Sequence, residues 1–134
     1  SQMGESLMRY YAGEAFDVYS AGIEPKGINP YTRRALAEVG LDMAGQYSKD
    51  VNEYLGKVAF TYVIAVCGHA DANCPVVLIQ NSQRLFWPFD DPAAAEGDDA
   101  EKLAQFRTVR DQIDARIRVW LQEQGIRHSR PLAV

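Results

Sequence analysis

The stretch "AFTYVIAVCGHADANCP", residues 59–75, decides how this chain folds and points to its chemistry. Its first half is a continuous apolar run rich in β-branched residues, which is typical of a strand buried on both faces of a sheet. Its second half is polar and holds the only two cysteines, Cys67 and Cys74. We therefore expect a strand that ends at about Cys67, at the sheet edge where open α/β folds bind ligands.

Helices and strands alternate on either side of this strand. The spacing of apolar residues and the positions of turn residues predict the following elements: helix 1–13, strand 16–23, helix 29–40, a short helix at 49–57, strand 84–89 and helix 98–123. The last helix has a predicted buried stripe of Leu103, Phe106, Val109, Ile113, Ile117 and Trp120. This alternation predicts an α/β domain with a mainly parallel sheet.

Composition narrows the class of protein. The chain has 134 residues, 47% of them apolar, which suits a single domain over residues 1–134. Its net charge of −4 argues against a non-specific nucleic-acid binder. We recognise neither a signal peptide nor an apolar run of the roughly 18 residues that a membrane span needs. The expected location is therefore the cytoplasm, with neither nucleic acid nor membrane as a partner.

The cysteine pair allows three interpretations. The first is a redox-active pair, because stable disulfides are rare in the cytoplasm and paired cysteines there are more often catalytic or metal-binding. A zinc site would use Cys67, His69 and Cys74, and its fourth ligand would be the distant His128 or a carboxylate. Free cysteines are also common in protein cores, so two unrelated buried residues remain a third possibility.

Geometry restricts how the two cysteines could form a disulfide. If residues 68–74 are helical, the rise between Cys67 and Cys74 is about 10 Å. A disulfide needs Cα atoms within about 7 Å, so the segment must bend or unwind for the bond to form. Pro75 weakens helical geometry at Cys74, and Gly68 loosens the other end. These features describe a segment that is able to change shape between reduced and oxidised forms.

Two other stretches suggest chemistry only weakly by themselves. Asp90 and Asp91 precede Pro92, and an Asp-Pro pair usually initiates a turn. An aspartate beside aromatic groups can instead have its pKa raised and act as a general acid. The chain opens with Ser1 before a predicted helix, where a serine caps the helix and the free amides suit an anion.

Taken together, these stretches resemble the thioredoxin-coupled arsenate reductases, a branch of the low-molecular-weight protein tyrosine phosphatase family. The matching segments run in order along the chain: "SQMGE" at 1–5, "VYSAGIEPKGINP" at 18–30, "VCGHADANCP" at 66–75, "FWPFDDPA" at 86–93 and "FRTVRDQI" at 106–113. The cysteine pair followed by Asp-Asp-Pro is specific to the reductase branch. Typical phosphatases carry an aromatic residue after Asp-Pro, where this chain has Ala93.

The resemblance implies a three-layer sandwich around a four-stranded parallel sheet. It also implies that the central first strand and a phosphate-binding loop, Cys-x5-Arg-Ser, lie before Gln2 and end at Ser1. On this basis residues 1–134 form one domain that is incomplete at its N-terminus. The chain as written is then expected to be inactive, because its two cysteines match the second and third of the family relay.

The resemblance also implies a role for each site residue. A loop cysteine attacks arsenate, Asp91 protonates the leaving oxygen, and Ser1 helps to hold that cysteine as a thiolate. Cys67 then attacks the arsenylated sulfur and releases arsenite. Cys74 attacks Cys67, and thioredoxin reduces the resulting Cys67–Cys74 disulfide. The implied substrate is arsenate or a phosphate-like oxyanion, the protein is a monomer without a bound cofactor, and the two cysteines rest reduced and apart.

Some relatives bind potassium near the loop through a helix glutamate, a serine and a later acidic residue. Glu5 and Ser20 match the first two ligands, but Lys49 stands at the third position. A lysine there argues against a potassium site, and we expect no metal.

Two alternative functions remain open. One is a phosphatase acting on phosphotyrosine or small aryl phosphates, which would use Asp91 but neither cysteine of the pair. The other is a non-catalytic binding module built on the same scaffold.

Overall fold

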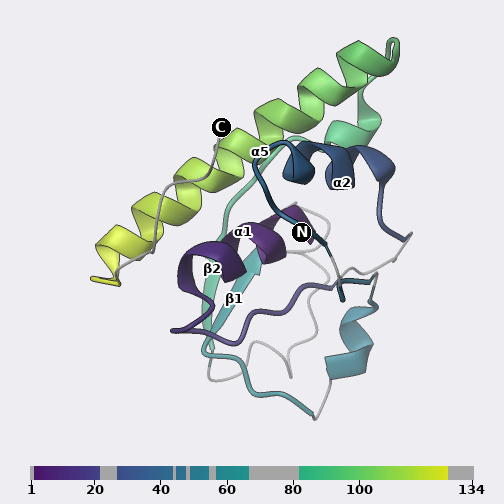
Figure 1. The fold of residues 1–134 in the computed structure, drawn as a ribbon. Helices are drawn as coiled ribbons and strands as arrows, with labels where there is room; N and C mark the ends of the chain where they lie inside the picture. Colours follow the sequence, from purple (N-terminus) through teal and green to yellow (C-terminus); the bar gives the residue numbers. More distant parts are fainter. Residues whose placement is uncertain are drawn as a thin grey trace.

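The fold is taken from a computed structural model of the chain. It describes residues 2–21, 27–43, 45–47, 49–54, 57–66 and 82–126. The elements, drawn in Figure 1, are α1 (Gln2–Ala12), α2 (Pro30–Ala37), η1 (Val51–Tyr54), β1 (Tyr62–Ala65), β2 (Gln83–Phe86), η2 (Pro92–Ala94) and α5 (Asp99–Glu123). Among the described residues three α-helices accompany a parallel strand pair, so the predicted α/β class is confirmed.

The described part of the sheet consists of β1 and β2, which pair in parallel from Tyr62 opposite Gln83 to Ala65 opposite Phe86. The predicted parallel arrangement is confirmed, whereas only two of the four predicted strands are present in the described residues. The strand predicted over 16–23 is not formed in its described part, residues 16–21. A strand requires a ladder partner, and neither β1 nor β2 pairs with this segment.

The burial predicted for β1 is only partly right. Ala65 is buried, but Val63 and Ile64 are half-buried rather than fully covered. Among the described residues β1 has a hydrogen-bonded partner, β2, on one edge only.

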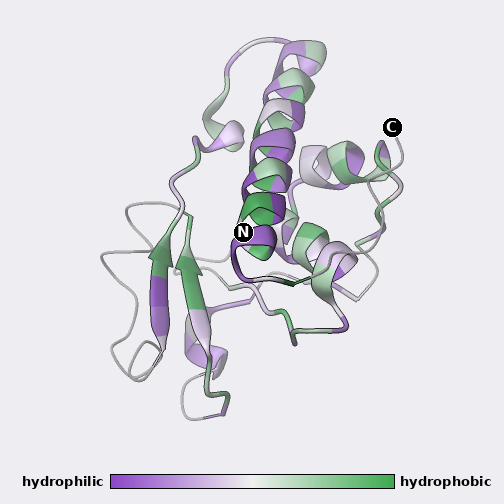
Figure 2. Cartoon of the chain, turned by 90° about the vertical axis from the view of Figure 1, so that its left-hand side faces the viewer, coloured by the Kyte–Doolittle hydropathy of each residue, from purple (hydrophilic) through white to green (hydrophobic). Residues whose placement is uncertain are grey.

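Helix α5 is the scaffold on which the rest of the described chain packs. Asp98 caps it by accepting a hydrogen bond from the Glu101 amide at 2.9 Å. It contacts both α1 and α2, and Figure 2 shows the two strands on one side of the α-helices. The predicted apolar stripe is confirmed, and it joins a buried cluster of Met3, Leu7, Met8, Tyr11, Ala12, Ala35, Leu36, Met43, Trp87, Leu103, Phe106, Val109, Ile113, Ile117, Trp120 and Leu121.

Aromatic rings join α5 to the sheet. The ring of Trp120 meets that of Tyr62 edge-on, with centroids 5.0 Å apart, and that of Trp87 at 5.9 Å. Edge-to-face aromatic pairs contribute about 0.5–1.5 kcal/mol beyond the area they bury. These contacts fix how the strand pair lies against the helices.

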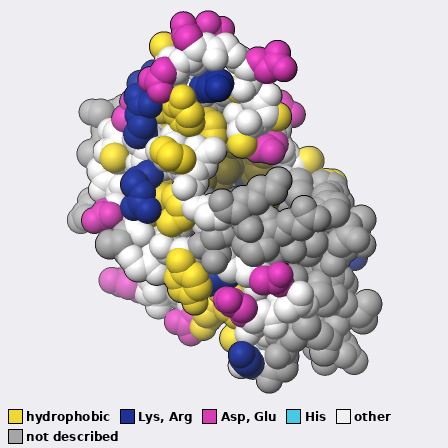
Figure 3. Space-filling view, turned by 90° about the vertical axis from the view of Figure 1, so that its right-hand side faces the viewer, with side chains coloured by type: hydrophobic (Ala, Val, Ile, Leu, Met, Phe, Trp, Pro, Cys, Tyr) yellow, Lys and Arg dark blue, Asp and Glu magenta, His cyan; other side chains and the backbone are white. Residues whose placement is uncertain are grey.

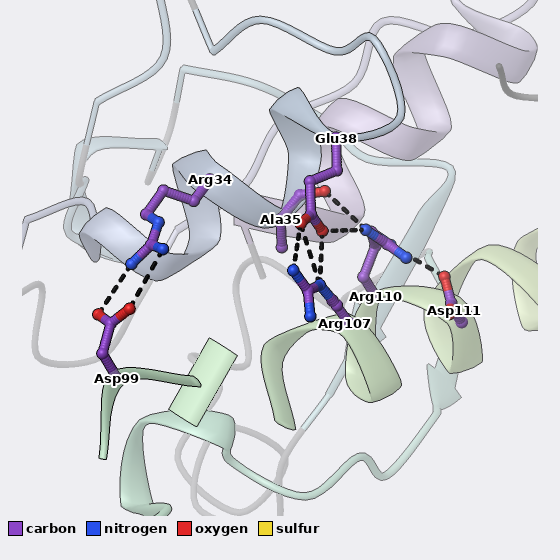
Figure 4. Close-up of polar contacts among 7 residues, drawn as sticks. All are labelled: Arg34, Ala35, Glu38, Asp99, Arg107, Arg110 and Asp111. Carbon is purple, nitrogen blue, oxygen red and sulfur yellow. Dashed lines mark hydrogen bonds and ion pairs between the residues drawn. The ribbon is translucent and has the colours of Figure 1, made fainter. Parts of the chain in front are cut away.

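Side chains bind free backbone groups at both ends of helix α2. Asn29 accepts a hydrogen bond from the Tyr31 amide at 2.9 Å, and Pro30 occupies the first turn, as predicted. At the carboxyl end, the Arg110 guanidinium donates to the Ala35 carbonyl at 2.9 Å. Figure 4 shows that Arg110 reaches this carbonyl from α5, so one side chain both caps α2 and joins the two helices.

Charges are distributed unevenly over the described surface. Acidic residues are exposed around the start of α5, and Figure 3 shows acidic side chains gathered at the upper end of one face. Within the part of the chain that the structure describes, every helix is too short or too polar to cross a membrane.

Candidate functional site

The carboxyl ends of the strand pair and the start of α1 meet at one edge of the sheet. In Figures 1 and 2 the beginning of α1 lies close to the heads of both strand arrows. Backbone pairing continues past the strands, because Trp87 donates to the Ala65 carbonyl at 2.9 Å and Phe89 donates to the Val66 carbonyl at 3.2 Å. The chain leaving β1 and the chain leaving β2 therefore start from neighbouring positions.

Asp91 emerges at this edge, two residues beyond the last of these backbone pairs. Its side chain is exposed and accepts a hydrogen bond from the Ala93 amide at 3.0 Å, which caps the short helix η2. Asp90 is exposed as well. The turn-forming role predicted for Asp-Pro is confirmed, and the acid role of Asp91 stays a prediction.

The other predicted site residues, Ser1, Cys67 and Cys74, lie outside the described residues. By sequence, Cys67 directly follows Val66, whose carbonyl bonds to the segment that leads to Asp91. The histidines of the zinc alternative, His69 and His128, also lie outside. Among the residues that are described, no group of three or more acidic, histidine or cysteine side chains could hold a metal ion.

A buried charged cluster supports the first turn of α1. The Glu5 side chain is 1% exposed and that of Lys49 is 6% exposed, with Nζ 3.3 Å from Glu5 Oε1. The Ser20 hydroxyl donates to the same oxygen at 2.5 Å. The second oxygen, Oε2, makes no aligned hydrogen bond but lies 2.8 Å from Nη1 of the partly exposed Arg9.

Two tyrosines surround this cluster. The Lys49 ammonium donates to the Tyr47 carbonyl at 3.1 Å and lies 4.5 Å from the centre of the Tyr47 ring. The Tyr54 hydroxyl donates to the Ser20 carbonyl at 3.3 Å. Burial, followed by the nearby charge of Glu5, raises the pKa of Tyr54 to about 12.

Gln46 is a second contact to the first turn of α1, and sequence reasoning missed it. Its amide donates to the Gln2 carbonyl at 3.1 Å, and its carbonyl oxygen accepts a hydrogen bond from the Ser6 hydroxyl. No local pattern could have revealed it, because its partners lie about forty residues away in the sequence. Gln46, through Gln2 and Ser6, and Lys49, through Glu5, therefore both bind the first turn of α1.

Comparison with known proteins identifies the family. Residues 1–130 match the model of the low molecular weight phosphotyrosine protein phosphatase family. The chain belongs to this family. The resemblance seen in the sequence is thus confirmed over nearly the whole chain.

Within the low molecular weight phosphatase family, the chain is similar to curated arsenate reductases. It is 45% identical over 122 residues to an arsenate reductase of Halalkalibacterium halodurans, covering 91% of this chain and 86% of that protein. It is 41% identical over 118 residues to the arsenate reductase of Bacillus subtilis, covering 88% and 84%. The family's reductase branch is therefore the one this sequence resembles.

Solved structures agree with this placement. An arsenate reductase in its oxidised state superposes with a TM-score of 0.76 at 27% identity, covering 92% of this chain and 88% of that one. An arsenate reductase in the phosphate-binding state gives a TM-score of 0.73 with the same identity and coverage. The predicted fold family is thus confirmed.

The buried cluster does not fit the potassium site that the sequence resemblance raised. Glu5 and Ser20 lie together as the resemblance implied, but the Lys49 ammonium donates to the carboxylate oxygen that a cation would use. A second cation in contact with this ammonium would be repelled in a buried site. The residues of this chain therefore provide a charged lysine in place of a metal ligand.

Proposed function

We propose that this protein reduces arsenate to arsenite, with the oxyanion bound at the start of α1. The support that carries the proposal is the identity of 45% and 41% to curated arsenate reductases over about nine-tenths of the chain. Asp91 follows the last backbone pair beyond the carboxyl ends of the two strands by two residues, and this position supports a role at the sheet edge.

The proposed reaction is a relay of three cysteines. A thiolate from the loop expected before Ser1 attacks arsenate, and Asp91 donates a proton to the oxygen that leaves as water. Cys67 attacks the arsenylated sulfur, so a disulfide forms and two electrons pass to arsenic, which leaves as arsenite. Cys74 displaces the first cysteine from Cys67, and the dithiol of thioredoxin reduces the Cys67–Cys74 disulfide. The net change is one arsenate reduced and one thioredoxin dithiol oxidised.

The proposed architecture is a four-stranded parallel sheet in a protein that acts as a monomer. A strand before Ser1 would give residues 16–21 and the free edge of β1 the neighbour that they lack among the described residues. Size-exclusion chromatography of the full chain that the gene encodes tests the monomer, and amide exchange protection at residues 16–21 tests the additional pairing.

The relay is tested by replacing each cysteine with serine in that full chain. Cys67→Ser and Cys74→Ser should each abolish arsenate turnover with thioredoxin and thioredoxin reductase, because each removes one sulfur of the final disulfide. Hydrolysis of para-nitrophenyl phosphate should persist, since it needs neither residue. Continued thioredoxin-dependent arsenate reduction by both variants would rule out the relay.

Two neighbouring aspartates give a matched test of the acid. Asp91→Asn should lower turnover by a factor on the order of 10² to 10⁴, as expected for loss of a general acid. Asp90→Asn removes the same charge from an exposed neighbour and should leave turnover within about twofold. Equal effects of the two substitutions would assign the loss to charge or turn geometry instead.

A phosphatase is the second candidate, because the matching family model is that of a phosphotyrosine protein phosphatase. This activity would use the same oxyanion site without Cys67 and Cys74. Efficient hydrolysis of a phosphotyrosine peptide together with no arsenate reduction would favour it over the relay.

A further inference from the structure

The first turn of α1 contains a carboxylate that water scarcely reaches. Glu5 lies in the first turn of α1 and is 2% exposed, and Ser20, which donates to it, is 8% exposed. A buried carboxylate is costly unless its charge is compensated. We propose that the Lys49 ammonium is a built-in cation that takes the place of a bound potassium ion at Glu5 and positions the start of α1.

The surroundings of the ammonium are those of a small cation. Its Nζ donates to Glu5 Oε1 at 3.3 Å and to the Tyr47 carbonyl at 3.1 Å. The face of the Tyr47 ring covers it at 4.5 Å, a favourable distance for a cation–π contact. Carboxylate and carbonyl oxygens are the ligands that hard cations take in proteins, so removing the lysine would leave a cavity suited to one.

Arg9 does not make Lys49 redundant. Of the two Glu5 oxygens, its guanidinium pairs with Oε2, and its side chain is 48% exposed, so solvent and salt weaken that pair. Lys49 pairs with the other oxygen, Oε1, and its side chain is buried, at 6% exposed. The inward-facing oxygen therefore depends on Lys49 and on the Ser20 hydroxyl.

Lys49 acts on the helix start through the loop that carries it. Gln46 of the same loop bonds to the Gln2 carbonyl and to the Ser6 hydroxyl, so both side chains hold the same turn. Fixing the loop to Glu5 fixes the helix end that binds the oxyanion. This second step rests on the proposed function, whereas the cation replacement itself does not.

The experiment uses Lys49→Ala in the full chain that the gene encodes, with Lys57→Ala as the exposed matched control. Melting temperature and phosphate affinity are measured at equal ionic strength in potassium, ammonium or choline chloride. In choline, Lys49→Ala should melt roughly 10 °C lower than the parent protein and bind phosphate on the order of tenfold more weakly. Potassium and ammonium ions should restore much of both losses, while the parent and the control respond equally to all three salts.

A double variant keeps the test decisive if Lys49→Ala does not fold. Glu5→Gln combined with Lys49→Met removes both charges and should melt near the parent, with no preference among the salts, because neutral replacement of a buried pair is tolerated. If this double variant also fails to fold, or if the loss in Lys49→Ala is the same in every salt, the lysine only fills space and the proposal is wrong. Salt-specific rescue of stability in a protein that reduces no arsenate would refute the proposed function alone.

Discussion

Two groups of ion pairs hold this molecule together in opposite settings. On the α2–α5 face, Glu38 bonds to Arg107 and Arg110, with Glu38 36% and Arg107 45% exposed (Figure 4). At the start of α1, Glu5 and Lys49 pair with side chains almost fully buried. The first group lies mostly in water and the second is removed from it, although the charged atoms of the exposed pairs are the closer ones, at 2.5 and 3.0 Å against 3.3 Å.

The difference shows that distance alone does not rank an ion pair. Exposed pairs contribute about 0.2–1 kcal/mol, because water and salt screen them. Breaking a buried pair costs about 3–5 kcal/mol, since it leaves an uncompensated charge in the interior. Burial of the partners should therefore decide the order of the effects below.

The largest effect is expected from Glu5→Gln, which leaves the Lys49 ammonium buried without its counter-ion. Urea denaturation should show a free energy of unfolding lower by about 3–5 kcal/mol. Glu53→Gln, an exposed glutamate nearby in the sequence, is the control and should change it by less than about 0.5 kcal/mol. Similar losses of the free energy of unfolding in the two variants would show that burial of the Glu5–Lys49 pair does not make it more important than an exposed glutamate.

Arg110→Met should have an intermediate effect, because Arg110 is the buried member of the exposed network. It is 8% exposed and its loss leaves the Ala35 carbonyl without this donor. Hydrogen bonds from charged groups contribute about 1.5–3 kcal/mol, and the free energy of unfolding should fall by that amount. A loss as small as that of Arg107→Ala would show that capping of α2 contributes nothing.

Arg107→Ala should lower the free energy of unfolding by less than Arg110→Met does at neutral pH, because water and salt screen the exposed pair with Glu38. The hydrogen bonds from Arg107 hold the pKa of Glu38 below its ordinary value of 4.5. A carboxyl whose pKa is lowered in the folded state stabilises the fold above its ordinary pKa, and that contribution disappears as pH falls through the lowered pKa.

The difference between the parent and Arg107→Ala should therefore shrink as the pH falls below 4.5, measured by urea denaturation across that range. Arg33→Ala, at an exposed position on α2, is the control and should show no such change. A difference that grows toward low pH would contradict the assignment.

The smallest effect is expected from Asp99→Asn. Asp99 pairs with Arg34 at 2.9 Å, with the two side chains 65% and 48% exposed, and it also accepts from the Tyr31 hydroxyl at 2.9 Å. In low salt, urea denaturation should show a smaller fall in the free energy of unfolding than for Arg107→Ala. In 1 M sodium chloride the difference should vanish, because the screening length drops to about 3 Å. A loss that persists in high salt would come from the hydrogen bond with the Tyr31 hydroxyl instead of the ion pair.

Local sequence patterns predicted where the helices begin and which face they bury, but not which strands find a partner in the sheet. Asn29 with Pro30 marked the start of α2, and the stripe from Leu103 to Trp120 marked the buried face of α5, because capping and helical periodicity are encoded within a few residues. The strand over 16–23 failed in its described part, because a strand depends on a neighbour that no local pattern supplies.

Some residues of the candidate site could be identified from the sequence and others could not. The sequence identified Asp91 as a turn residue, and it identified Glu5, Ser20 and Lys49 as positions that matter. It could not show that Gln46 holds the first turn of α1, since hydrogen bonds between distant residues leave no local signature.

By itself, the sequence determined the family, the order of α1, α2, β1, β2 and α5, and the presence of a cysteine pair after β1. Only the tertiary structure decided what Lys49 does. The sequence shows a lysine at the position where the resemblance implied an acidic ligand, and this alone does not say what the lysine does. Folding brings residues 5, 20 and 49 together in the interior, where a single charge must be compensated, and there the lysine becomes the cation itself.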